Sequence, residues 1–207
     1  DISLDENTFF SGNPPTCDPI LAGRFLCDAI GKRLTSSLGY TLLYDDRDNR
    51  IRPTRGQSLG ISQDFAGLGG SVKYIKTRVN ADKYWKPFGN FVFGLSFEGG
   101  YIHPLENRGL AGIDDVRLTD RFYLGEPQMR GFDIRGVGPR VQRIFQEGKI
   151  VNGVAVNNPI TDRNQIQDDA IGGRFYYMGR AELQIPLGSG ARELGLRPSL
   201  FVDVGSV

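Results

Sequence analysis

Arg130 stands in the stretch PQMRGFDIRGVGPR, residues 127–140, which holds three arginines and three glycines and is too irregular for a helix or a strand. A guanidinium presents five donors in a planar fork, so it bridges two carboxylates better than a lysine would. Gly131 lets the backbone turn closely, and Phe132 offers a ring that can be buried as an anchor. This stretch therefore predicts an arginine that binds carboxylates, with an arginine in a solvated loop as the alternative.

Residues suited to other kinds of chemistry are scarce. The chain has 207 residues and one histidine, His103, and it contains no Cys-x-x-Cys pair, so neither a zinc site nor a histidine-based catalytic set is supported. The formal net charge of +1 gives no field that would attract nucleic acid. The sequence predicts a protein that is not an enzyme, holds no metal or cofactor and binds no nucleic acid.

Alternation of apolar and polar residues identifies the elements that must position Arg130. In TSSLGYTLLYD, the residues Leu38, Tyr40, Leu42 and Tyr44 share one face of a strand, because successive side chains of a strand point to opposite sides. About six such segments follow one another, each near the roughly 9–11 residues that cross a bilayer when tilted. The segments are residues 35–45, 57–65, 75–82, 90–100, 174–186 and 198–207.

The two faces of these strands differ in polarity. One face is polar throughout and includes Arg78, Asp82, Glu98, Arg180 and Glu182, which suits a wet lumen better than the dry core of a sandwich. No run approaches the roughly 20 apolar residues of a spanning helix. The pattern favours a membrane β-barrel, and a soluble antiparallel sheet packed on a second sheet remains the alternative because periodicity does not separate the two.

Two motifs far apart in the chain carry a family resemblance. The sequence PQMRGF, preceded by RLTDRFYLGE, together with the terminal SLFVDVGSV, resembles the BamA family of outer-membrane protein insertases, with an alphaproteobacterial character. The long sixth extracellular loop of that family carries an aliphatic-Arg-Gly-aromatic signature, which MRGF matches. YTLLYDDRDNRIRPTRGQ, SQDFAGLGG and RAELQIP also resemble the corresponding strands and turns, so the resemblance covers nearly the whole chain.

The resemblance implies an all-β fold: an antiparallel transmembrane β-barrel segment of the bacterial outer membrane, with about six strands of a sixteen-stranded barrel. Within a single barrel domain over residues 1–207, it implies an extracellular loop with a short helix at 1–32 and four strands at 33–102. A long extracellular loop at 103–170 would carry the motif and fold back into the lumen, and two strands would follow at 171–207. Six strands are too few to close such a barrel, so we expect the chain to self-associate through open sheet edges.

The resemblance also implies partners for the loop motif, which consists of Met129, Arg130, Gly131 and Phe132. In the family the motif arginine contacts acidic groups on the two strands that follow the loop, and the matching residues are Glu182 and Asp203, with Phe201 beside the latter. Alternation agrees at one point, because it places both carboxylates on the polar face of their strands. We therefore expect Arg130 to fix the loop tip to the lumenal wall and Phe132 to pack on that wall.

An exported location bears on the two cysteines, Cys17 and Cys27. An even number of cysteines in an oxidising compartment favours a disulfide, although two free thiols remain the alternative. A continuous α-helix would hold residues ten positions apart at about 15 Å, which is too far for a bond. The segment from Asp18 onward must therefore turn back on itself if the bridge forms.

The function implied by the resemblance is assembly of outer-membrane proteins. The full protein would fold and insert unfolded β-barrel clients into the lipid of the outer membrane, with periplasmic assembly lipoproteins as partners. Two alternatives remain at this point: a two-partner-secretion transporter of the same superfamily, and a β-barrel carrier of an apolar ligand.

Overall fold

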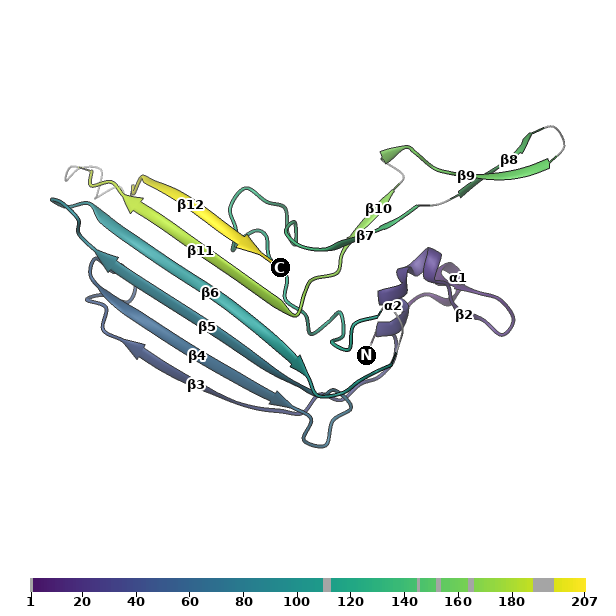
Figure 1. Ribbon diagram of the computed structural model, residues 1–207, viewed down its shortest axis with the longest axis horizontal. Coiled ribbons are helices and arrows are strands. Elements are labelled where there is room, and N and C mark those ends of the chain that lie inside the picture. The colour runs from purple at the N-terminus through teal and green to yellow at the C-terminus, as the bar shows by residue number, and fades with distance from the viewer. Residues whose placement is uncertain (1, 110–112, 145, 152–153, 164–165, 188–195) are drawn as a thin grey trace.

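The chain is organised around one antiparallel sheet, seen in a computed structural model that describes residues 2–109, 113–144, 146–151, 154–163, 166–187 and 196–207 (Figure 1). The strand order is β12-β11-β6-β5-β4-β3, so β6 and β11 are neighbours although a long connection separates them in sequence. The six strands predicted from alternation are therefore all present. They are β3 (Ser37–Asp45), β4 (Gly56–Ala66), β5 (Tyr74–Trp85), β6 (Val92–Pro104), β11 (Phe175–Gln184) and β12 (Ser199–Ser206).

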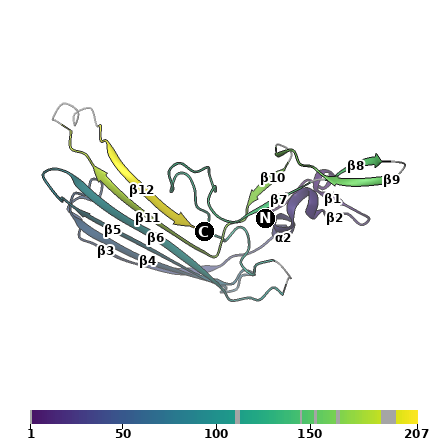
Figure 2. The same cartoon turned by 45° about the horizontal axis from the view of Figure 1, so that its top comes forward.

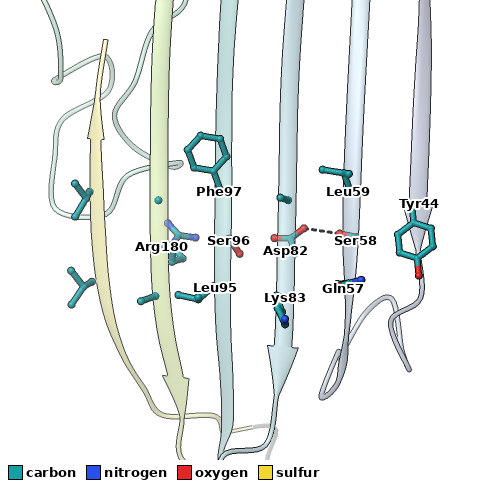
Figure 3. Close-up of a pocket in the computed structure, with 15 residues that line it drawn as sticks. Tyr44, Gln57, Ser58, Leu59, Asp82, Lys83, Leu95, Ser96, Phe97 and Arg180 are labelled. Carbon is teal, nitrogen blue, oxygen red and sulfur yellow. Dashed lines mark hydrogen bonds between the residues drawn. The ribbon is translucent and has the colours of Figure 1, made fainter.

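The two faces of the sheet have opposite character, as the alternation predicted. Leu38, Leu42 and Val202 point to one face and remain more than 60% exposed in the described chain. On the other face, the Ser58 hydroxyl donates to the Asp82 carboxylate over 2.9 Å (Figure 3). The open depression of about 640 Å³ in this stretch of sheet lies mainly on the apolar face, where Leu59, Leu95 and Phe97 line it (Figure 3). An apolar face this exposed is suited to contact with lipid.

The segment before β3 is more broken than the single short helix that the sequence predicted. Asp18 begins the turn, because its Oδ1 accepts the backbone N–H of Ile20 at 2.8 Å. Gly23 then adopts a positive φ of 86°, which interrupts the helix and starts a new one. None of the described helices is long and apolar enough to cross a membrane. The elements are α1 (Glu6–Phe9), β1 (Phe10–Ser11), β2 (Thr16–Cys17), the π-helix η1 (Pro19–Gly23) and α2 (Arg24–Ala29).

The long connection between β6 and β11 contains structure that the sequence did not predict. Two short antiparallel ladders form within it, one pairing β7 with β10 and the other pairing β8 with β9. The β7–β10 ladder is mostly exposed, so it requires no apolar alternation and left no periodic signal in the sequence. The strands are β7 (Arg140–Arg143), β8 (Gln146–Val151), β9 (Val154–Pro159) and β10 (Gln167–Ala170).

Two clusters of buried residues lie between this connection and the sheet. Figure 2 shows the first part of the connection on the concave side of the sheet, beside the end of β12. One cluster joins Ile102 and Tyr176 of the wall to Val116 and Phe122 of the connection, and a second cluster contains Leu124, Met129 and Met178. The core is thus formed by a loop packed on one sheet. The described chain contains no second sheet packed face to face on the first, which argues against the sandwich alternative.

Candidate functional site

Arg130 is held by a carboxylate of the last strand. Its Nε lies 3.0 Å from Oδ2 of Asp203 and its Nη2 lies 3.1 Å from Oδ1, so the guanidinium grips both oxygens of the carboxylate. The backbone N–H of Arg130 also donates to Oδ2 at 3.3 Å. The side chain of Asp203 is only 4% exposed, which strengthens these charge-assisted bonds relative to a solvated pair.

Glu182 and Phe201 complete the contacts of the Arg130 guanidinium. Nη1 lies 3.4 Å from Oε2 of Glu182, a longer contact than those to Asp203. The guanidinium carbon sits 3.2 Å from the ring centroid of Phe201, which is a cation–π contact. Glu182 belongs to β11 and faces Phe201 of β12 in the strand register. The structure therefore brings Arg130, Glu182, Phe201 and Asp203 together.

Arg180 is a fourth charged member of the site; alternation places it on the polar face, but the sequence did not predict its contact with Asp203. It lies directly opposite Asp203 in the register of β11 and β12, and its Nε is 2.8 Å from Oδ1 of Asp203. Its Nη2 donates to the backbone carbonyl of Gln128 at 2.6 Å. Arg180 thus links the wall to the loop just before the motif. Its place on the polar face was readable from alternation, but the register that sets it opposite Asp203 was not.

The other motif residues divide into a buried one and exposed ones. Met129 is 5% exposed and packs with Leu124 and Met178. Phe132 is 45% exposed, so its ring is not buried as an anchor, and its packing on the inner wall stays a prediction. Gly131, with a φ of 85°, turns the chain between Arg130 and Phe132, and Met129 is the apolar residue of the motif that is buried.

The electrostatics of the site favour permanent charge. The hydrogen bond with Asp203 raises the pKa of Arg130 above its ordinary value, and burial opposes this only in part. Two guanidiniums face two carboxylates, so the formal charges of the cluster balance. Among the residues that the structure describes, no group of His, Cys, Asp and Glu side chains could hold a metal ion. The arrangement can bind a loop to a wall.

The family model for the Omp85 superfamily domain matches residues 6–207, which is nearly the whole chain and includes the arginine site. The chain belongs to the Omp85 superfamily. Its sequence is 30% identical over 178 residues to the outer membrane protein assembly factor BamA of Neorickettsia risticii, an alphaproteobacterial relative as the motifs suggested. It is also 30% identical over 183 residues to the sorting and assembly machinery component 50 homolog of Homo sapiens.

The Omp85 chain spans a minor part of these relatives. Each alignment covers 86% of the chain, but only 20% of the Neorickettsia risticii protein and 32% of the human one. A crystal structure of BamA from Haemophilus ducreyi lacking POTRA domains 1-3 superimposes with a TM-score of 0.59 at 22% identity, covering 82% of this chain and 29% of that one. This similarity shows the shared fold: the six-stranded sheet corresponds to a section of an Omp85 barrel.

The cysteines of this Omp85 domain lie outside the arginine site, in the segment before β3. Cys17 and Cys27 form a disulfide with their Cα atoms 5.7 Å apart. The chain reverses between them because η1 ends at Gly23 and α2 starts at Arg24. One residue after Cys27, the Asp28 carboxylate accepts Nη1 of Arg108 at 2.8 Å, which ties α2 to the start of the long connection. The bridge therefore holds together a segment that is itself bound to the motif-bearing loop.

Proposed function

We propose that this chain is the section of an outer-membrane protein insertase in which the long loop is fixed to the barrel wall by Arg130. The Omp85 superfamily consists of outer-membrane proteins, and the chain lies in the bacterial outer membrane with its exposed apolar face toward lipid. The complete protein folds client β-barrels and inserts them into that membrane. It does so as an assembly factor and without catalysing a covalent reaction.

The observation that supports this function is the contact of Arg130 with two successive strands at once. Asp203 belongs to β12 and Glu182 to β11, so one guanidinium spans the seam between these strands. A loop fixed in this way stiffens the wall and fills part of the lumen. Because the wall is stiff at this point, the opening that a client needs for entry must form between other strands of the complete barrel.

The loops follow the orientation implied by the family. Residues 1–32 and 103–170 lie on the extracellular side, and the short turns after β3 and β5 lie on the periplasmic side. The partners of the complete protein are outer-membrane lipid, unfolded β-barrel clients and periplasmic assembly lipoproteins. Expressed alone, the chain exposes β3 and β12 as the edges of the described sheet, and these edges pair with further copies.

Depletion and complementation test the function. The complete gene that contains this chain is expressed in cells depleted of their own copy, and the folded fraction of several unrelated β-barrel proteins is measured. We expect the wild-type gene to restore all of them and the Arg130→Ala variant to restore them poorly. Restoration of a single secreted polypeptide, with no effect on resident barrels, would instead identify a two-partner-secretion transporter. Failure of Arg130→Ala to reduce assembly would reject the role of the loop contact.

A further inference from the structure

We propose that the long loop has a second, independent anchor, in which Phe122 is a wedge that sits on a glycine notch of the wall at Gly100. The proposal extends the proposed function, because both anchors would hold the same loop in the lumen during client assembly. Phe122 and Arg130 lie on the same connection, and their wall contacts lie at different heights of β11.

The notch is a wall position without a side chain. Gly100 of β6 pairs with Tyr176 of β11, and a Cβ placed at Gly100 would lie 2.6 Å from Cζ of Phe122 and 2.7 Å from Cε1 of Tyr176. Such distances are far inside van der Waals contact, so the Phe122 ring occupies the space that any other residue at position 100 would fill. The ring is 7% exposed, and its centroid is 4.5 Å from that of Tyr176.

Cations and backbone bonds reinforce the wedge. Nζ of Lys76 lies 4.6 Å from the Phe122 ring centroid and donates to the carbonyl of Asp120 at 2.8 Å, so one wall side chain grips both ring and backbone. Phe122 and Gly173 exchange two backbone hydrogen bonds of 2.9 and 3.0 Å. These bonds fix the loop to the chain segment that enters β11.

The residue before the wedge is equally restrained. Arg121 is 7% exposed, and its Nε and Nη1 donate to the carbonyls of Val116 and Ile171 at 3.0 and 3.1 Å. A buried guanidinium bound to two carbonyls is costly to displace, because its polar groups would lose their partners. The anchor therefore combines an apolar wedge with a buried polar clamp.

The two anchors are separate in space and in kind. Tyr176, Met178, Arg180 and Glu182 alternate along one face of β11, and the loop contacts them in turn. Tyr176 and Glu182 are separated by roughly 20 Å at the rise per residue of a strand. The Glu182 end depends on charge, whereas the Tyr176 end depends on packing and cation–π contact. Two contacts at that separation fix the direction of the loop, which a single contact would leave free to pivot.

Hydrogen exchange on the complete protein tests the independence of the two anchors. The peptides to follow are those covering residues 120–124, which report on the Phe122 bond to Gly173, and those covering residues 128–132. In Gly100→Ala, we expect exchange at 120–124 to accelerate about tenfold or more. In Arg130→Ala, we expect 128–132 to accelerate while 120–124 stays protected. The proposal is overturned if Arg130→Ala alone releases 120–124, or if Gly100→Ala leaves it unchanged.

A compensating substitution at position 122 distinguishes a specific clash between Phe122 and position 100 from general damage to the barrel. Phe122→Leu shortens the side chain, so we expect it to restore part of the protection that Gly100→Ala removes. The matched control is Gly179→Ala, which adds the same methyl group to β11 where the nearest atom is the Val204 carbonyl at 4.0 Å. In this control, hydrogen exchange at residues 120–124 should equal that of the wild type. Equal acceleration in the control, or no restoration in the double variant, would reject the notch.

Client assembly measured on the same variants separates the two proposals. We expect Gly100→Ala with Arg130→Ala to lose more assembly than either single variant. Suppose that hydrogen exchange at residues 120–124 accelerates in Gly100→Ala as expected, but that none of these variants changes the folding of resident β-barrel proteins. The second anchor is then supported and the insertase function is rejected. If Arg130→Ala impairs client assembly while hydrogen exchange at residues 120–124 is unchanged in Gly100→Ala, the insertase function is supported and the second anchor is rejected.

Discussion

Asp203 holds Arg130 through both of its carboxylate oxygens, at 3.0 and 3.1 Å, across 73 positions of sequence. The same carboxylate also accepts a hydrogen bond from Nε of Arg180, on the adjacent strand, at 2.8 Å. The buried carboxylate of Asp203 thus forms ion pairs with Arg130 of the loop and with Arg180 of the wall at the same time.

Charge reversal tests the pairing of Arg130 with Asp203. Arg130→Glu alone and Asp203→Arg alone each place like charges together, and we expect each to lower barrel stability by about 2 kcal/mol or more. The double variant restores opposite charges and should recover part of both losses. The measurement is the temperature at which the folded protein unfolds on semi-native gels, together with client insertion. A double variant no better than the sum of the singles would mean that Arg130 acts on another partner.

Removal of Arg180 tests its contribution as the second cation. Arg180→Met keeps much of the side-chain length but loses the bonds to Asp203 and to the Gln128 carbonyl, so we expect a loss of about 1–2 kcal/mol. Arg180→Lys should recover only part of this, because an ammonium lacks the planar fork. Thermal unfolding of the complete protein provides the measurement.

The control for Arg180 is Arg50, which pairs with Asp45 at 3.3 Å while its side chain is 79% exposed. Arg50→Ala should change stability by no more than about 1 kcal/mol, as is usual for exposed pairs. A result in which Arg50→Ala and Arg180→Met are equally damaging would show that Arg180 acts as an ordinary surface charge.

The Cys17–Cys27 disulfide should make a measurable difference between the protein with the bridge and the protein without it. Alkylation without reductant, followed by mass spectrometry, should label neither Cys17 nor Cys27. Replacing both by serine should destabilise their segment locally by roughly 3 kcal/mol, because the bridge closes a loop of about ten residues. Limited proteolysis should then cut between residues 17 and 27 while the strands stay intact. Two labelled thiols in the untreated protein would exclude the bridge.

A low-pH prediction follows from the turn between β3 and β4. The Asp48 carboxylate accepts the hydroxyl and the backbone N–H of Thr54 at 2.6 and 2.8 Å and the N–H of Arg55 at 3.1 Å, and these bonds hold the pKa of Asp48 well below its usual range. Because the folded-state pKa is depressed, the stabilisation is complete above the unfolded value of about 3.9 and is lost as the pH falls through the folded value.

We expect Asp48→Asn to lower the unfolding temperature at pH 7 and to have a smaller effect at the lowest accessible pH. The control is Ile51→Ala at the tip of the same turn, where the side chain is 88% exposed and no such bond is lost. A difference between Asp48→Asn and the wild type that stays constant from pH 7 to below pH 3 would contradict the depressed pKa.

The sequence by itself determined the wall. Alternation set the six strands and assigned Glu182 and Asp203 to the polar face, since a period of two leaves each strand only two ways to face. The motif MRGF and the terminal FVDVG identified the family because the two together are specific. Helices, turns and short ladders were less predictable, because Gly23 and the β7–β10 pairing depend on local backbone geometry that composition does not encode.

Only the tertiary structure decided how the loop meets the wall. The register of β11 against β12 set Arg180 opposite Asp203, and a shift of two residues would have kept Arg180 on the polar face but moved it away from Asp203. Phe132 is exposed beyond the turn at Gly131, whereas Met129 before that turn is buried. The seat of Phe122 on Gly100 likewise joins residues of different segments. Such contacts depend on the placement of whole elements in three dimensions, and a linear pattern of residue types carries no record of that placement.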